Sequence, residues 1–189
     1  MVDMDVKIEN VVASGSLKHG IDLNALVKAF PEAEYRPEQF PGVIFRLKKP
    51  KTATLIFGSG KMVCTGARSE RESGKALRKV VRILKKGGIV IMGRPEIKVV
   101  NVVASASLGR GVDLLGFYEA EVSLGGKIIY EPEQFPGLIY RMNDPKAVIL
   151  LFTSGNLVCT GAKKEEEVHK AIAKLHKRLE EKTGYITEF

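Results

Sequence analysis

The sequence contains one long motif twice. Residues 35–67 read YRPEQFPGVIFRLKKPKTATLIFGSGKMVCTGA, and residues 130–162 read YEPEQFPGLIYRMNDPKAVILLFTSGNLVCTGA, at a constant offset of 95 residues. A repeat of this length means that the chain holds two copies of one supersecondary unit. Any fold proposed for the chain must therefore accommodate internal duplication.

The duplication extends towards the N-terminus at a different offset. The segment NVVAS at 10–14 recurs at 101–105, an offset of 91, so the second copy carries four additional residues before residue 130. A charged segment with helical periodicity follows each copy. We therefore divide the chain into a first repeat, residues 1–92, and a second repeat, residues 93–189, joined intimately in one domain.

Composition indicates a globular protein. The chain has 189 residues, of which 44% are hydrophobic, and this is ample for a core. No apolar run approaches the length of a membrane span, so the sequence predicts a soluble, intracellular protein without a membrane partner. Cys64 and Cys159 occupy equivalent strand positions and are expected to be buried, reduced thiols, with a disulfide as the less favoured reading.

The net charge of +8 is distributed unevenly. Residues 1–95 contain 18 Lys and Arg against 9 Asp and Glu, whereas residues 96–189 contain 12 against 13. A basic half beside a nearly neutral one suggests a polyanionic partner that the two halves bind with unequal strength. The alternative is that the charge belongs only to a solvated basic helix.

Periodicity predicts strands and helices in the same order in both repeats. Alternation of apolar residues predicts these strands: 6–14, 43–47, 52–57 and 61–65, then 97–105, 138–142, 147–152 and 157–160. Short helices are expected after Asp22 and Asp113, which are suitable N-caps, and long helices over 69–86 and 165–182.

The central strands are apolar on both faces, so both faces need to be covered. Four helices can cover one face of a sheet of about ten strands but not both, and the second face is therefore predicted to be open to a partner. The open-face residues are Asn10, Val12, Leu55, Phe57, Val63 and Thr65, with Asn101, Val103, Leu150, Phe152, Val158 and Thr160 in the second repeat.

Asn10 and Asn101 lie within apolar stripes, where an amide without partners is costly. Cross-strand hydrogen bonds would explain them structurally, and ligand contacts would explain them functionally. Their duplication favours a functional use.

The motifs NVVAS, EQFPG, LxFxSG and VCTGA, each present twice, resemble the TATA-box-binding protein family over essentially the whole chain. The lack of a long low-complexity N-terminal extension is similar to archaeal members, of which the chain would be the core domain. Archaeal relatives tend to be acidic, however, and this chain is basic. The resemblance implies an α+β fold: a saddle-shaped, curved antiparallel sheet of about ten strands, built from two tandem pseudo-symmetric repeats, with helices on the convex face.

The resemblance also implies a function. The chain would be a general transcription initiation factor, not an enzyme, that binds and bends TATA-box DNA through the minor groove. It would recruit transcription factor B and, indirectly, RNA polymerase. No cofactor is expected, and the protein would be cytoplasmic and associated with the nucleoid, or nuclear in a eukaryote.

The open face suits the minor groove of A·T pairs, which presents only acceptors, whereas guanine adds an obstructing amino donor. Asn10 and Asn101 would donate to these acceptors, and Thr65 and Thr160 would add hydroxyls near the centre. The apolar residues that would pack on the groove floor are Val12, Leu55, Val63, Val103, Leu150 and Val158.

Other residues acquire roles from the resemblance. Phe40 with Phe57, and Phe135 with Phe152, would be wedges that enter base steps at the two ends of the site. The predicted phosphate contacts are Arg46, Lys61 and Arg141, with Asn156 in place of a second lysine. The partner-binding residues would be Glu131, Glu133 and Gln134, in the turn offered to transcription factor B.

Two other classes of function remain open. A sheet that binds single-stranded nucleic acid or RNA is the runner-up, because Phe on a sheet can stack unpaired bases. An interaction scaffold without nucleic acid is third. Catalysis finds little support, since the histidines form no ligand set, and His169 and His176 are expected to be solvated.

Overall fold

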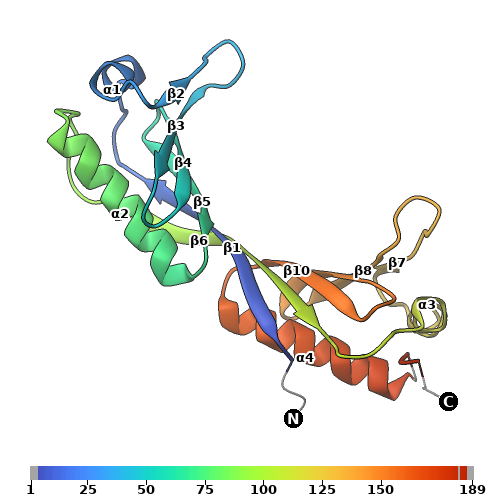
Figure 1. Ribbon diagram of the computed structural model, residues 1–189. Helices are drawn as coiled ribbons and strands as arrows, with labels where there is room; N and C mark the ends of the chain where they lie inside the picture. The colour runs from blue at the N-terminus through green and yellow to red at the C-terminus, as the bar shows by residue number, and fades with distance from the viewer. Residues whose placement is uncertain (1–3, 183, 187–189) are drawn as a thin grey trace. The chain divides into compact units, whose positions relative to one another are not determined.

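The computed structural model describes residues 4–182 and 184–186, which form ten strands and four helices (Figure 1). The strands are β1 Val6–Ser16, β2 Glu34–Tyr35, β3 Gly42–Leu47, β4 Thr52–Phe57, β5 Lys61–Ala67, β6 Glu96–Ser107, β7 Ile128–Ile129, β8 Leu138–Asn143, β9 Lys146–Leu151 and β10 Asn156–Ala162. The helices are α1 Leu23–Ala29, α2 Glu70–Lys86, α3 Leu114–Val122 and α4 Glu165–Glu181. The predicted α+β class with two tandem copies is confirmed.

The strands follow the order β2-β3-β4-β5-β1-β6-β10-β9-β8-β7 in one hydrogen-bonded sheet. By packing, the chain divides into two compact units: a first-repeat unit, Asn10–Val100, and a second-repeat unit, which comprises the chain through Glu9 together with the chain from Asn101 onwards. The long strands β1 and β6 therefore contribute residues to both units. The sequence boundary at residue 92 describes the repeat rather than the packing, and it stays a prediction.

In the first-repeat unit, α2 covers one face of the sheet. Met62 and Cys64 on β5 are fully buried there, together with Leu77, Val80 and Leu84 of α2. Phe30, at the end of α1, packs edge-on against Phe45 of β3 with ring centroids 5.5 Å apart. Buried residues alternate with partly exposed ones along β4 and β5, and the partly exposed side chains lie on the opposite face of the sheet. Only one face of this unit therefore carries a core.

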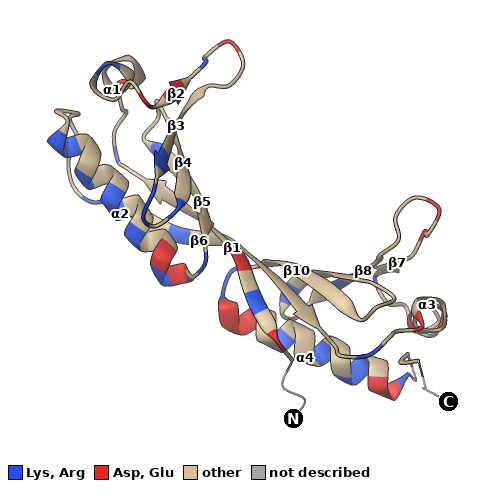
Figure 2. Cartoon of the chain, in the orientation of Figure 1, with Lys and Arg blue, Asp and Glu red and all other residues tan. Residues whose placement is uncertain are grey.

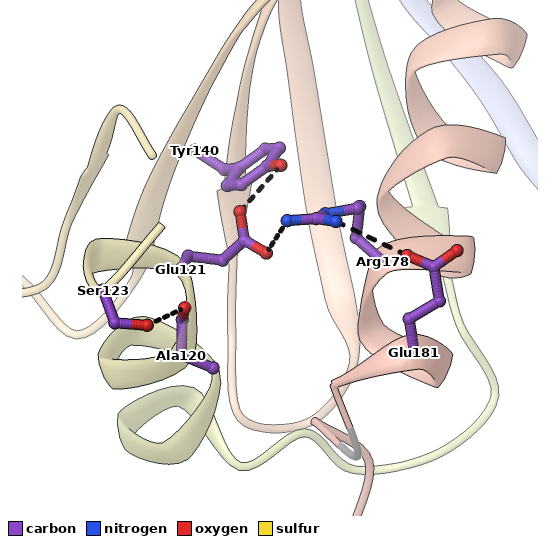
Figure 3. Close-up of polar contacts among 6 residues, drawn as sticks. All are labelled: Ala120, Glu121, Ser123, Tyr140, Arg178 and Glu181. Atoms are coloured by element: carbon purple, nitrogen blue, oxygen red, sulfur yellow. Dashed lines mark hydrogen bonds and ion pairs between the residues drawn. The ribbon is translucent and has the colours of Figure 1, made fainter. Parts of the chain in front are cut away.

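The second-repeat unit has the same plan, with α4 packed on β9 and β10. One difference lies in its core, where Glu121 of α3 is only 2% exposed. Figure 3 shows its carboxylate between two partners: the Arg178 guanidinium donates to Oε1 at 2.7 Å, and the Tyr140 hydroxyl donates to Oε2 at 3.3 Å. A buried carboxylate is tolerated here because it is both ion-paired and hydrogen-bonded.

Side-chain hydrogen bonds cap three of the four described helices at their predicted starts, and α4 has no such cap. Asp22 accepts from the Ala25 amide and Asp113 from the Gly116 amide, each at 3.0 Å, and Ser69 Oγ accepts from the Glu72 amide at 3.0 Å. Each cap satisfies one of the amides that the first helical turn leaves without a partner.

The periodicity of the sequence does not predict two of the strands. The edge strands β2 and β7 are two residues long, and so short a segment carries no period. They exist because β3 and β8 supply hydrogen-bonding partners.

The prediction that His176 is solvated is wrong. Its side chain is 15% exposed, Nδ1 is hydrogen-bonded to the Tyr185 hydroxyl, and Nε2 lies 3.4 Å from Glu180 Oε1. The cause is the segment Gly184–Ile186, which returns to pair Tyr185 with Val112 in an isolated bridge. Helical periodicity cannot reveal this distant contact.

Both cysteines are buried and unpaired, as predicted. Burial raises the pKa of the Cys159 thiol to about 11, so it stays protonated and unreactive at neutral pH. Across the described residues, no helix has the length and apolar character needed to cross a bilayer.

Candidate nucleic-acid interface

The face of each unit that no helix covers carries the predicted open-face residues. On the first-repeat unit, Leu55 pairs with Val63 and Ala53 with Thr65 across β4 and β5, so their side chains share this face. Each open-face residue is partly exposed: Asn10, Val12, Leu55, Phe57, Val63, Thr65, Asn101, Val103, Leu150, Phe152, Val158 and Thr160. The structure therefore gathers the predicted residues into one surface on each unit. Their DNA-binding roles stay predictions.

Asn10 is held in a single orientation by its neighbours. Its Oδ1 accepts from the Gly66 amide at 2.7 Å, and its Nδ2 donates to Thr65 Oγ1 at 3.0 Å. A backbone N–H can only donate, so the atom that it meets must be the amide oxygen. Nδ2 is thereby placed beside Thr65 with a second hydrogen for which no bond is seen in the described chain. The cross-strand bonds are present, and they leave a donor on the open face.

Asn101 repeats this arrangement closely. Its Oδ1 accepts from the Gly161 amide at 2.7 Å, and its Nδ2 donates to Thr160 Oγ1 at 3.1 Å. The glycine has a φ of +89°, in the left-handed region that favours glycine, where β10 loses its regular register with β6. The VCTGA motif thus supplies both the hydroxyl and the amide that orient the asparagine.

A pair of phenylalanine rings lies at the end of β4. Phe40 and Phe57 pack edge to face with centroids 5.7 Å apart, and Phe40 remains 37% exposed. Both rings crowd Gly42, where an added Cβ would lie 2.9 Å from Phe40 and 3.1 Å from Phe57. Glycine in the EQFPG motif therefore allows the two rings to sit side by side.

The second-repeat unit has a matching pair. Phe135 and Phe152 have centroids 6.0 Å apart, Phe135 is also 37% exposed, and a Cβ at Gly137 would lie 2.7 Å from Phe135. The two pairs of rings therefore share both geometry and accessibility.

Cationic residues border the face unequally. Arg46 donates to Glu34, on the adjacent strand β2, at 3.3 Å. Arg141 has no such carboxylate on its adjacent strand β7, where Ile129 takes the place of Glu34. Lys61 is exposed at the start of β5, and Asn156 takes its place on β10. Lys61 and Arg141 are exposed, whereas Arg46 is exposed but ion-paired with Glu34, and their phosphate contacts stay predictions.

Sequence reasoning missed several residues of the same face. Ile44 pairs with Leu55, and Ile139 with Leu150, so both extend the apolar surface. Alternation along β3 and β8 could have revealed them once the register was known. Lys7 was missed for another reason: it lines a groove of about 400 Å³ together with Phe152 and Asn156, which are remote in sequence.

The turn 131–134 is exposed, as its proposed role requires. The Gln134 amide donates to the Glu131 carbonyl at 2.9 Å, and in the first repeat the Gln39 amide donates to the Arg36 carbonyl at 2.9 Å. The turns thus share one backbone conformation and differ in charge, and Figure 2 shows acidic colour on the loop between β7 and β8. Among the described residues, no group of His, Cys, Asp and Glu could hold a metal ion.

Comparison with known proteins finds relatives that match most of the chain. The family model described as "Transcription factor TFIID (or TATA-binding protein, TBP)" matches residues 5–87 and 96–182. The TATA-box-binding protein of Pyrodictium occultum is 52% identical over 172 residues, or 91% of this chain and 84% of the relative. That of Archaeoglobus fulgidus is 46% identical over 180 residues, or 95% and 97%. The solved structure of Methanococcus jannaschii TBP matches with a TM-score of 0.81 at 46% identity, covering 93% of this chain and 98% of that one.

Proposed function

We propose that this chain, which belongs to the TATA-binding protein family of transcription factors, binds A·T-rich promoter DNA through the open faces of its two units. Members of this family act by binding rather than by catalysis, so the expectation of a non-enzymatic role is confirmed by family membership.

The oriented amides of Asn10 and Asn101 carry this proposal. Each presents an N–H donor on an otherwise apolar face, because its oxygen is already occupied by a backbone amide. The minor groove of A·T pairs offers adenine N3 and thymine O2 as acceptors, and it lacks the guanine amino group. A face with donors set in an apolar surface complements that groove and disfavours G·C pairs.

The phenylalanine pairs support bending of the DNA. An apolar wedge inserted at a base step unstacks it and kinks the duplex, a mechanism for which TATA-binding proteins are the standard example. Phe40 and Phe135 are both exposed enough to enter a step, with Phe57 and Phe152 packed against them.

Energy transfer between dyes at the ends of a TATA duplex tests both ideas. Phe57→Ala and Phe152→Ala should each reduce bending and weaken binding by about 1 to 3 kcal/mol, the range for aromatic contacts to bases. Val90→Ala, on an exposed residue outside the face, is the control. An unchanged bend in both variants would refute the wedge role, and equal binding of single strands would favour the alternative of a single-strand binder.

The turn 131–134 is proposed to contact transcription factor B, which in turn recruits RNA polymerase. Glu131, Glu133 and Gln134 are exposed there, and acidic side chains steer a basic partner. Glu131→Arg, which gives the turn the charge of its first-repeat counterpart, should abolish the ternary complex in a gel shift. Glu38→Arg, on the matching turn of the first repeat, should preserve it. Loss of DNA binding by Glu131→Arg itself would contradict the assignment.

A further inference from the structure

The outer side of α3 exposes a row of apolar side chains. Leu115, Tyr118 and Val122 are three and four residues apart and therefore lie along one face of the helix. Leu115 is 56% exposed, Val122 is 45% exposed, and Leu124, just beyond the helix, is 59% exposed. Isolated exposed leucines are ordinary, whereas contiguous ones mark interaction surfaces. We call these four residues the α3 stripe.

The fold of a repeat does not require the α3 stripe. In the first repeat, the position of Leu115 is held by Asn24 and that of Val122 by Pro31, whereas Val27, at the position of Tyr118, packs against the core. None of the large exposed hydrophobic residues lies on α1, all of whose residues are described. Because α1 caps its own unit without an apolar outer side, the α3 stripe serves some purpose other than folding.

The inner side of α3 is anchored firmly. Phe117 is fully buried and packs against Tyr140 at 5.8 Å, and Glu121 holds Arg178 of α4 (Figure 3). Tyr140 pairs with the buried Ile149, so α3 packs on the helix-covered side of the sheet rather than on the open face. The α3 stripe is thus a rigid platform away from the proposed DNA surface, and rigidity lowers the entropic cost of binding.

Acidic residues border the α3 stripe. Glu119 is exposed on the same helix, and the Tyr118 ring lies 6.3 Å from the ring of Tyr130, which precedes the exposed Glu131. Figure 2 shows acidic colour on α3 and on the loop between β7 and β8. An apolar strip with an acidic border complements an amphipathic helix that has basic edges. Nucleic acid fits poorly, because its phosphates would meet carboxylates.

We propose that the α3 stripe is a docking site for a basic amphipathic helix of a partner protein. A second copy of this chain does not provide that helix, because the apolar seam of its basic helix α2 is buried, including Leu77, Val80 and Leu84. This surface is distinct from the DNA face and adjoins the proposed contact for transcription factor B.

Fluorescence anisotropy with synthetic peptides tests the proposal on the full chain. The probe is a labelled helical peptide of about 18 residues, long enough to form a helix, with a leucine seam and lysine edges. Two comparison peptides replace the edges with glutamate or the seam with serine. Leu115→Gln and Val122→Gln should each weaken binding of the lysine-edged peptide about tenfold, as expected for central apolar contacts. Asn24→Gln, at the position that matches Leu115, should leave it unchanged.

The outcomes separate this site from the proposed DNA function. TATA-duplex affinity and the thermal melting temperature should be unaffected by the α3 variants, because their side chains are exposed. Equal binding of the glutamate-edged peptide, or unchanged binding by Leu115→Gln and Val122→Gln, would overturn the proposal. Self-association in sedimentation experiments that Leu115→Gln abolishes would also overturn it, by identifying a second copy as the occupant.

Discussion

The two repeats agree on the open face of the sheet and differ on the helix side. Asn10 and Asn101 meet their glycine amides at the same 2.7 Å, and the phenylalanine pairs have centroids 5.7 and 6.0 Å apart. On the helix side, the apolar contact of Phe30 with Phe45 is replaced by a buried carboxylate between Arg178 and Tyr140.

This contrast fits the proposed function, in which DNA lies on the open faces of both units. In the proposed function, a duplex would present similar groove edges to both units, and matching donors and rings suit such a ligand. The helix sides differ in charge. Basic residues outnumber acidic ones on α2, whereas α4, with Glu165, Glu166 and Glu167 in its first turn, has more acidic residues than Lys and Arg. Divergence on the helix side is the behaviour expected if each unit offers a different surface to protein partners.

The largest effect should come from the buried carboxylate found only in the second repeat. Glu121→Ala should lower the free energy of unfolding by about 3 kcal/mol, because it leaves Arg178 without its acid and Tyr140 without an acceptor. This value is the lower end of the usual cost of breaking a buried ion pair, because the Arg178 side chain is 30% exposed. Chemical denaturation measures this change. Glu119→Ala, on an exposed neighbour, should hardly change the free energy of unfolding. Equal decreases for both variants would show that the buried ion pair stabilises the fold no more than an exposed carboxylate does.

The asparagine amides should show matched effects in the two repeats. Asn10→Asp and Asn101→Asp keep an oxygen for the glycine amide but remove the donor, and each should cost roughly 1 to 3 kcal/mol of binding to an A·T site. Titrations against A·T and G·C-substituted duplexes provide the comparison. If both duplexes weaken equally, the amides are structural; if only one variant matters, the units do not contribute equally.

Tyr140→Phe copies the residue of the first repeat and should cost about 1 kcal/mol at neutral pH, the value of one hydrogen bond. The pKa of Tyr140 is raised, mainly by burial and also by Glu121. A raised pKa in the folded state gives stability that is present below pH 10 and is lost as pH rises through the folded value. Thermal melts from neutral to strongly alkaline pH should therefore show a shallower alkaline decline for Tyr140→Phe than for the wild type. An identical decline would assign the titration to another group.

The smallest effect concerns charge at the border of the face. Lys61→Ala should lower the magnitude of the slope of log K against log salt by about 0.9, the contribution of one neutralised phosphate. It should weaken all sequences about equally, whereas Asn156→Ala should hardly change the slope. Asn156→Lys should give the second repeat the lysine that the first repeat has at this position, and should raise the slope magnitude by a similar amount. Equal slopes for the wild type and Lys61→Ala would show that Lys61 is only solvated.

The duplication, the main strands and the long helices could be read from residue order alone. The capped helices after Asp22 and Ser69 begin where predicted, because capping is a contact between residues three apart. The open face was predicted because strand alternation is also local, and because four helices cannot cover two faces. Local rules therefore placed Asn10, Val63 and Thr65 on one surface.

Contacts between distant segments required the folded chain. The ion pair of Glu121 with Arg178, the burial of His176 beneath Tyr185 and the placement of Lys7 near Asn156 join residues with no common periodicity. The orientation of Asn10 depends on where Gly66 interrupts the register of β5 with β1, and no local pattern specifies that register. Alternation determines which face a side chain occupies, whereas the direction of its donors depends on partners that only long-range strand pairing brings together.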